Sequence, residues 1–216
     1  MKFDPQKLIT FENNFSLPIA GIDEVGRGPL AGPVIAAAVI LDRKNIPEGI
    51  NDSKKIPKAK RILLAEKIKE NSIYAYGAAS EIEIDEINIL QASLLAMKRA
   101  SDRLSVVPKT TLIDGNFKPD IKNNTISIIK GDSKSVSIAA ASILAKVYRD
   151  EIMLKYSKQF PEYGFQTNSG YGTKEHLSAL KNYGITPIHR KSFKPCLLYT
   201  SPSPRDATLS RMPSSA

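Results

Sequence analysis

The stretch that decides the fold is Ile19–Leu41, IAGIDEVGRGPLAGPVIAAAVIL. Two apolar runs flank the adjacent acids Asp23 and Glu24 and a glycine-rich turn. Apolar runs bounded by glycine and proline are typical of buried strands, so the stretch predicts a β-hairpin formed by Ile19–Val25 and Gly32–Leu41. A carboxylate in such a strand costs several kcal/mol unless it is paired or binds a cation. The acidic pair therefore predicts a cation site.

The 216-residue chain carries 31 Lys and Arg against 22 Asp and Glu, a net charge of +9. Such an excess favours polyanionic partners such as nucleic acid; the alternative is an ordinary solvated basic surface. The N-terminal residues carry acids and lack a signal-peptide core, and no apolar run approaches the roughly 20 residues that span a bilayer. The single cysteine, Cys196, excludes an internal disulfide. We expect a cytoplasmic protein, and a monomer.

The rest of the chain alternates helix-like and strand-like patterns. Apolar residues at steps of three and four predict helices, and short apolar runs predict strands. The predicted order, β-β-α-β-α-β-β-α, indicates an α/β fold with a mixed sheet. We expect helices over residues 58–71, 83–104 and 135–156 and strands over residues 73–79, 110–113 and 125–129.

Composition divides the chain into four segments. Residues 1–17 are polar with scattered aromatics and predict an N-terminal arm. We expect the α/β domain over residues 18–158 and a small helical extension over residues 159–195. Residues 196–216 are rich in Ser and Pro and lack periodicity, which predicts a non-native or disordered tail. We expect nothing in this tail to join a core.

Asp23, Glu24, Asp114 and Asp132 stand at predicted strand ends or at a strand-to-helix junction. Asp114 is also followed by glycine, a common turn pair, and Asp132 is alternatively the cap of the next helix. Consecutive strand residues point to opposite faces, so the first two acids share a site only if the strand ends or bends, as Gly26 permits. Together the acids indicate a two-metal phosphoryl-transfer site, and oxygen ligands select Mg²⁺ or Mn²⁺.

Other chemistries fit the sequence less well. The turn reads G-x-G-x-x-x-G and is followed by a second apolar run, where a dinucleotide site needs a helix; no Gly-Lys-Ser/Thr follows either. Ser and His show no nucleophile spacing. We interpret His176 and His189 as structural residues, because two-metal catalysis does not require a protein base.

Several long motifs follow one another in order from about residue 18 to residue 195. They are GIDEVGRGPLAGPV, NDSKK at 51–55, IDG at 113–115, KGDSKSVSIAAASILAKVYRD, GYGT at 170–173 and HRKSF at 189–193. Together these motifs resemble bacterial ribonuclease HII. The resemblance implies a ribonuclease H fold with a five-stranded sheet, in which Asp23, Glu24, Asp114 and Asp132 are the catalytic quartet that binds two divalent ions.

The resemblance also implies how the substrate is recognised. Gly26, Arg27 and Gly28 match the motif that recognises the 2′-hydroxyl of a ribonucleotide. Tyr171 matches the tyrosine that stacks on the following deoxyribose; the alternative for it is a core position. Family members nick on the 5′ side of a ribonucleotide embedded in duplex DNA, leave 3′-hydroxyl and 5′-phosphate ends, and cut the RNA of RNA–DNA hybrids.

Basic residues near these motifs are candidate phosphate contacts, although each alone is more often a solvated charge. Two alternatives stay open: a nucleic-acid-binding protein of the same fold without catalysis, and a ribonuclease of long hybrids without junction recognition. A sliding clamp is a compatible partner for which the sequence shows no motif. The predicted contacts are Lys54, Lys134 and Arg190, followed by Lys55, Lys130, Lys146, His189 and Lys191.

Overall fold

The computed structural model describes residues 5–51, 53 and 55–198. The chain forms two compact units. The sheet unit comprises Met1–Arg27 and Pro33–Ile152, and the C-terminal unit comprises Gly28–Gly32 and Met153–Ala216. The segment boundaries predicted at residues 17, 158 and 195 stay predictions. No helix in the described ranges is both long and apolar enough to cross a membrane.

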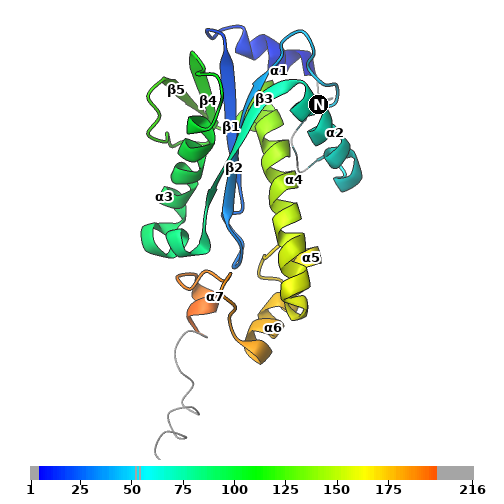
Figure 1. Cartoon of the computed structure of the whole chain (residues 1–216), viewed down its shortest axis with the longest axis vertical. Helices are drawn as coiled ribbons and strands as arrows, with labels where there is room; N and C mark the ends of the chain where they lie inside the picture. Colours follow the sequence, from blue (N-terminus) through cyan, green and yellow to red (C-terminus); the bar gives the residue numbers. More distant parts are fainter. Residues whose placement is uncertain (1–4, 52, 54, 199–216) are drawn as a thin grey trace, which may run out of the picture. The chain divides into compact units, whose positions relative to one another are not determined.

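The sheet unit is built on a five-stranded sheet in the order β3-β2-β1-β4-β5 (Figure 1). β1 pairs antiparallel with β2 and β2 with β3, whereas β1 pairs parallel with β4 and β4 with β5. These pairings confirm the predicted hairpin and the predicted mixed sheet. The strands are β1 (Ile19–Val25), β2 (Val34–Leu41), β3 (Ser72–Ala79), β4 (Thr110–Asp114) and β5 (Asn124–Ile128).

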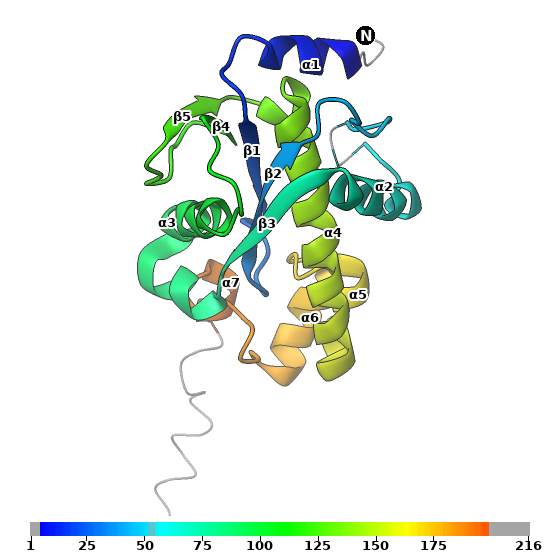
Figure 2. The same ribbon diagram turned by 45° about the horizontal axis from the view of Figure 1, so that its top comes forward.

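Helices flank both faces of this sheet (Figures 1 and 2). α3 lies against one face and the first part of α4 against the other, so every residue of β2, an interior strand between β3 and β1, is buried. Burial on both faces explains why β2 is a continuous apolar run rather than an alternating one. The helices of the sheet unit are α1 (Pro5–Glu12), α2 (Lys58–Glu70), α3 (Glu81–Asp102), the short 3₁₀ helix η1 (Gly131–Ser133) and α4 (Val136–Gln159) as far as Ile152, the last residue of this unit.

A glycine sets the distance between α4 and β1. A Cβ added to Gly21 would lie 2.1 Å from the carbonyl carbon of Ser137, so any other residue would push the helix away from the strand. The small face of α4, which the sequence shows as three alanines followed by Ser142, lies on this side of the sheet. The close packing brings Ser142 within reach of the acids on β1.

The helix predicted over residues 83–104 begins earlier and is interrupted. α3 starts at Glu81, and Asn88 has φ 68° and ψ 165°, which breaks the helical path. The side-chain oxygen of Asn88 accepts hydrogen bonds from the backbone N–H groups of Leu90 and Gln91, at 3.0 and 3.1 Å, and so starts the second helical segment. Apolar periodicity continues across the break, which is why the sequence predicts one helix.

The C-terminal unit packs its own small core from apolar and aromatic residues. Cys196 is fully buried in it, so our expectation that nothing from residue 196 onward joins a core is wrong at that position. The helices of this unit are η2 (Pro161–Tyr163), α5 (Phe165–Asn168), α6 (Lys174–Tyr183) and α7 (Lys194–Leu197). The buried core residues are Leu30, Ala31, Met153, Tyr163, Phe165, Ala179, Leu180, Ile188 and Cys196.

Candidate active site

Asp23 and Asp114 lie side by side on neighbouring parallel strands. Ile22 of β1 is in register with Ile113 of β4, and each acid is the next residue along its strand. Residues in register on adjacent strands point to the same face of a sheet. Asp23 and Asp114 are 91 positions apart in the sequence. The pairing of β1 with β4 nevertheless makes their carboxylates neighbours in the sheet unit.

The electrostatics of these acids call for a cation. Burial raises the pKa of Asp23 well above its usual range, and repulsion from Glu24 and Asp114 raises it further. Burial also raises the pKa of Glu24, an effect that the Arg27 guanidinium 3.3 Å away partly offsets. Like charges gathered in a poorly solvated place are costly for the fold, and a bound cation reduces that cost.

Asp23 and Glu24 are consecutive residues of a regular strand, so their side chains point to opposite faces of the sheet. Asp23 is in register with Ala37 and Glu24 with Ala36, and β1 continues to Val25, so a bend at Gly26, which the sequence permits, would lie beyond both acids. Asp23 faces α4, and Glu24 therefore points to the opposite face of the strand. Even so, the negative charge of Asp114 acts on both carboxylates.

The fourth predicted acid lies in the loop that follows β5. Asp132 is half-buried in η1, and the neighbouring backbone N–H of Gly131 donates to Asp114 Oδ1 at 2.6 Å. α4 begins only at Val136, so the alternative interpretation, that Asp132 caps this helix, does not fit. The hydrogen bond from Gly131 instead connects the Asp132 loop to the acid at the end of β4.

We tested whether these residues suit a divalent metal ion. Within residues 5–51, 53 and 55–198, no three Asp, Glu, His or Cys side chains are grouped closely enough to hold an ion as they stand. The carboxylate oxygens are the hard ligands that Mg²⁺ and Mn²⁺ prefer. Burial raises the pKa values of Asp23 and Glu24, and the negative charge of Asp114 raises both further. The donor set therefore fits such ions, and ligation by three or more acids requires side-chain movement.

A buried chain of hydroxyl groups supports Asp23, and sequence reasoning missed it. The Ser142 hydroxyl donates to Asp23, so the Ser53 hydroxyl, 2.9 Å from Ser142 Oγ, is the donor to Ser142. The Arg61 guanidinium donates to the Ser53 carbonyl at 2.7 Å. The only signal in the sequence is that Ser53 and Ser142 fall inside the two motifs at 51–55 and 130–150.

Gly26 occupies a position that only glycine can fill. Its φ is +97°, and an added Cβ would lie 2.3 Å from Arg149 Nε and 2.8 Å from the Pro33 carbonyl oxygen. Arg149 is fully buried, and its Nε donates to that same carbonyl at 3.0 Å. The side chain of Arg149 therefore encloses the glycine turn, a role that sequence reasoning did not assign to it.

In the C-terminal unit, Gly28 lies beside Tyr171. A Cβ added to Gly28 would be 3.4 Å from Tyr171 Cε1. The Tyr171 side chain is 47% exposed, which excludes the alternative of a core tyrosine. Arg190 is fully buried, and its guanidinium donates to the Gly32 carbonyl through Nε at 3.0 Å and Nη2 at 2.6 Å. Its predicted contact with phosphate stays a prediction, and its position shows that it holds the 28–32 segment.

The remaining basic candidates differ in exposure. Lys54 lies outside the described residues. Lys146 is half-buried and paired with Asp150 at 2.6 Å, and His189 is buried. The exposed candidates are Lys55, Lys130, Lys134 and Lys191.

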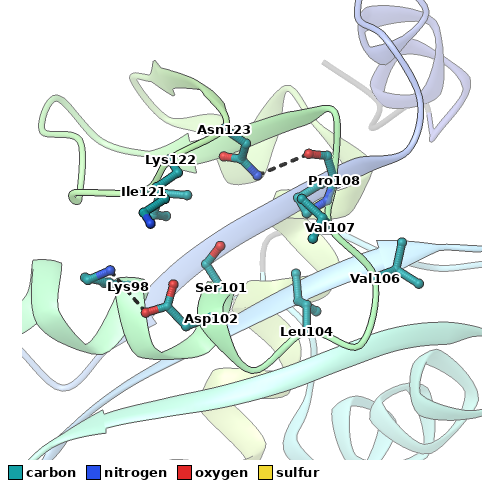
Figure 3. A pocket seen from close by; sticks show the side chains of 10 residues that line it. All are labelled: Lys98, Ser101, Asp102, Leu104, Val106, Val107, Pro108, Ile121, Lys122 and Asn123. Carbon is teal, nitrogen blue, oxygen red and sulfur yellow. Dashed lines mark hydrogen bonds and ion pairs between the residues drawn. The ribbon is translucent and has the colours of Figure 1, made fainter.

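The sheet unit also contains a pocket of about 500 Å³ that is distinct from the acids (Figure 3). Pro108 lines it just before β4 begins, whereas Asp114 ends β4, so the pocket lies at the opposite end of that strand. Lys98 in its wall is paired with Asp102 at 3.1 Å. We therefore do not assign the pocket to the active site. It is lined by Lys98, Ser101, Asp102, Leu104, Val106, Val107, Pro108, Ile121, Lys122 and Asn123.

The fold and its acids define a class of protein, the ribonuclease H-like nucleases. The ribonuclease HII of Archaeoglobus fulgidus, solved in complex with PCNA, superposes with a TM-score of 0.71 at 27% identity, over 82% of this chain and 96% of that one. The Bst ribonuclease HIII in complex with Mn²⁺ gives a TM-score of 0.70 at 21% identity, over 90% of this chain and 72% of that one, and shows the same fold.

Sequence comparison is more specific. The family model of ribonuclease HII matches residues 20–196. A ribonuclease HII of Pelagibacter ubique is 58% identical over 178 residues, which are 82% of this chain and 96% of the relative. The chain belongs to the ribonuclease HII family, whose members are metal-dependent endonucleases that act on RNA–DNA substrates.

Proposed function

We propose that the chain hydrolyses the phosphodiester bond on the 5′ side of ribonucleotides embedded in duplex DNA, and cuts the RNA of RNA–DNA hybrids, leaving 3′-hydroxyl and 5′-phosphate ends. The observation that carries the proposal is the juxtaposition of Asp23 and Asp114 on adjacent strands, where burial and mutual repulsion favour a bound cation. The metal dependence of the family agrees with this chemistry.

In this proposal Asp23, Glu24, Asp114 and Asp132 hold two divalent ions, Mg²⁺ or Mn²⁺. When bound, the ions would activate the attacking water and stabilise the leaving oxygen. The protein supplies the orientation of the ligands. Ser142 donates to Asp23, and the backbone N–H of Gly131 donates to Asp114.

Recognition of the ribonucleotide is assigned to Gly26, Arg27 and Gly28, and recognition of the junction to Tyr171. The 2′-hydroxyl is the chemical group that distinguishes a ribonucleotide from its DNA neighbours, and backbone without a Cβ approaches it most closely. The crowded turn at Gly26 and the half-exposed ring of Tyr171 support these assignments.

The excess of positive charge supports a polyanionic substrate. The chain carries +9, and Lys55, Lys130, Lys134 and Lys191 are exposed. Phosphate contacts release counterions, so we expect affinity for the duplex to fall steeply as salt is raised. Binding that is independent of salt concentration would contradict this part of the proposal.

We also propose a sliding clamp as a partner, on the basis of one structural neighbour. The Archaeoglobus fulgidus neighbour was solved in complex with PCNA. Co-elution of this chain with a bacterial sliding clamp on size exclusion would support the partnership, and separate elution at micromolar concentrations would contradict it.

Substrate selectivity is tested with two duplexes, one with a single ribonucleotide and one a continuous RNA–DNA hybrid. Tyr171→Ala should lose kcat/KM mainly on the single-ribonucleotide duplex, because stacking at the junction matters most there. Tyr183→Ala removes another exposed tyrosine of the same unit and is the matched control. Equal losses on both duplexes for Tyr171→Ala would favour a ribonuclease of long hybrids without junction recognition.

A further inference from the structure

The chain has two histidines, and they face each other inside the C-terminal unit. His176 Nε2 and His189 Nε2 are 2.9 Å apart, and the two side chains are 0% and 1% exposed. A nitrogen pair at this distance shares a single proton, so one ring donates and the other accepts.

The neighbours of the pair fix the direction of this hydrogen bond. The backbone N–H of Thr186 donates to His189 Nδ1 at 2.9 Å, so the proton of a neutral His189 is on Nε2 and is donated to His176. The proton of His176 is then on Nδ1, which donates to the carbonyl oxygen of Tyr171 at 2.9 Å. The two rings are therefore opposite tautomers in one chain of hydrogen bonds from Thr186 to Tyr171.

The chain of hydrogen bonds ends at Tyr171, whose backbone makes several further hydrogen bonds. The Tyr171 carbonyl also accepts from the backbone N–H of Thr173 at 2.8 Å, and the Tyr171 N–H donates to the Asn168 carbonyl at 2.9 Å. The ring itself is 47% exposed. The buried pair thus acts on a residue whose side chain faces outward.

We propose that the neutral His189–His176 pair is a positioning device that holds Tyr171 for its contact with the substrate and releases it when the pair takes up a proton. The inference rests on the role proposed above for Tyr171. Neither histidine is a catalytic residue in this account.

Protonation disturbs the hydrogen bonds of the pair, because each ring nitrogen that is open to a proton already faces an N–H group. A proton on His176 Nε2 would face the Nε2–H of His189 across 2.9 Å. A proton on His189 Nδ1 would face the Thr186 backbone N–H at 2.9 Å, beside the Thr186 hydroxyl at 2.8 Å. Burial lowers the pKa of both rings, that of His189 to about 4, and repulsion from His176 contributes to the latter. At neutral pH the pair is therefore uncharged.

The other polar and charged groups that face the pair neither take over its hydrogen bond nor keep it charged at neutral pH. Tyr163 of η2 packs on both rings and donates its hydroxyl to the Gly184 carbonyl. Glu175 of α6 raises the pKa of His176, less than burial lowers it. Arg190, next to His189, directs its guanidinium to the Gly32 carbonyl.

The first test is histidine NMR on the full unmodified chain. Because there are two histidines, ¹⁵N-histidine labelling gives four ring nitrogens in total. We expect opposite tautomers at pH 7.5, a scalar coupling between the two Nε2 atoms, and no titration of either ring near pH 6.5. The same tautomer in both rings, or a titration near 6.5, would overturn the proposal. This result does not depend on the proposed substrate.

The second test compares His176→Asn, whose amide nitrogen replaces the donor to Tyr171, with His176→Leu, which removes the donor. His176→Leu should lose at least tenfold in kcat/KM on the single-ribonucleotide duplex relative to the hybrid, without further loss on adding Tyr171→Ala. His176→Asn should retain most of the preference for the single-ribonucleotide duplex. In this variant the preference should also decline less at acid pH than in the unchanged chain. Equal behaviour of the two variants would overturn the proposal. If Tyr171→Ala alone leaves selectivity unchanged, the proposed role of Tyr171 fails, and the NMR result separately decides the hydrogen-bond chain.

Discussion

Asp114 Oδ1 accepts a hydrogen bond from the backbone N–H of Gly131 at 2.6 Å. The bond joins the last residue of β4 to the loop that carries Asp132. It therefore fixes the position of one proposed metal ligand relative to the segment that supplies another. Because β4 also aligns Asp114 with Asp23 on β1, Asp114 is the central member of the proposed quartet.

Asp114→Asn tests this central position. The amide oxygen can still accept from Gly131, so we expect the fold to persist, with a melting temperature close to that of the unchanged chain. Loss of the charge should lower turnover by orders of magnitude, because a carboxylate ligand of the metal site is gone. Asp102→Asn changes an exposed acid of α3 and serves as the control. Unchanged cleavage by Asp114→Asn would remove Asp114 from the quartet.

Asp23→Asn should stabilise the metal-free protein. Asp23 is 7% exposed and is repelled by Glu24 and Asp114, so neutralising it relieves unfavourable electrostatics in the folded state. Thermal unfolding in chelator should give a higher melting temperature for the variant. Added Mn²⁺ should stabilise the unchanged chain and have a smaller effect on the variant. A variant that melts lower in chelator and gains as much from Mn²⁺ would contradict the proposed cation site.

Gly26→Ala should damage the turn that follows the acids. Gly26 and Gly49 both have positive φ, +97° and +88°, but a Cβ at Gly49 meets nothing within 4 Å. Gly49→Ala should therefore cost about 1 kcal/mol of stability from backbone strain alone and leave cleavage intact. Gly26→Ala must also displace Arg149, so urea unfolding should show a larger loss, and kcat/KM should fall. Equal effects of the two changes would argue against the crowding at Gly26.

Glu12→Gln tests whether Glu12, at the end of α1, stabilises the fold by capping α4. Glu12 is fully buried, accepts from the Ser137 backbone N–H at 2.8 Å and pairs with Arg43 at 2.7 Å. Its carboxylate therefore caps the N-terminus of α4 and interacts favourably with the helix dipole. Glu12→Gln should lower the free energy of unfolding, measured in urea, by roughly 2 kcal/mol. Glu48→Gln, on an exposed loop, is the control and should change little. No loss for Glu12→Gln would show that the cap is dispensable.

Local patterns predicted much of this fold. The apolar run of residues 34–41 and the glycines before it predicted the β1–β2 hairpin, and the acids stood out because charge is rare in such strands. The structure then placed Asp23 beside Asp114, a relationship that depends on strand register. A single sequence gives no register between strands separated by two helices. The proximity of Asp23 and Asp114 therefore follows from the structure and could not be predicted from the sequence.

The features that sequence reasoning missed are all long-range or local exceptions to a pattern. Glu12 caps a helix that begins more than 120 residues later, and nothing near Glu12 indicates a partner. Arg149 appears in the sequence only as part of the motif at 130–150, and nothing there indicates that it is buried around Gly26. Asn88 breaks α3 without disturbing its apolar spacing, and Cys196 is buried although the residues after it are rich in Ser and Pro.

The most direct test of the central claim is to map the cut on an end-labelled DNA duplex that carries one ribonucleotide, with Mg²⁺, Mn²⁺ or chelator, beside an all-DNA duplex. The account predicts a single metal-dependent nick on the 5′ side of the ribonucleotide, with 3′-hydroxyl and 5′-phosphate ends and an intact all-DNA control. Binding of the duplex without cleavage in either metal would contradict it and indicate a nucleic-acid-binding protein of the same fold.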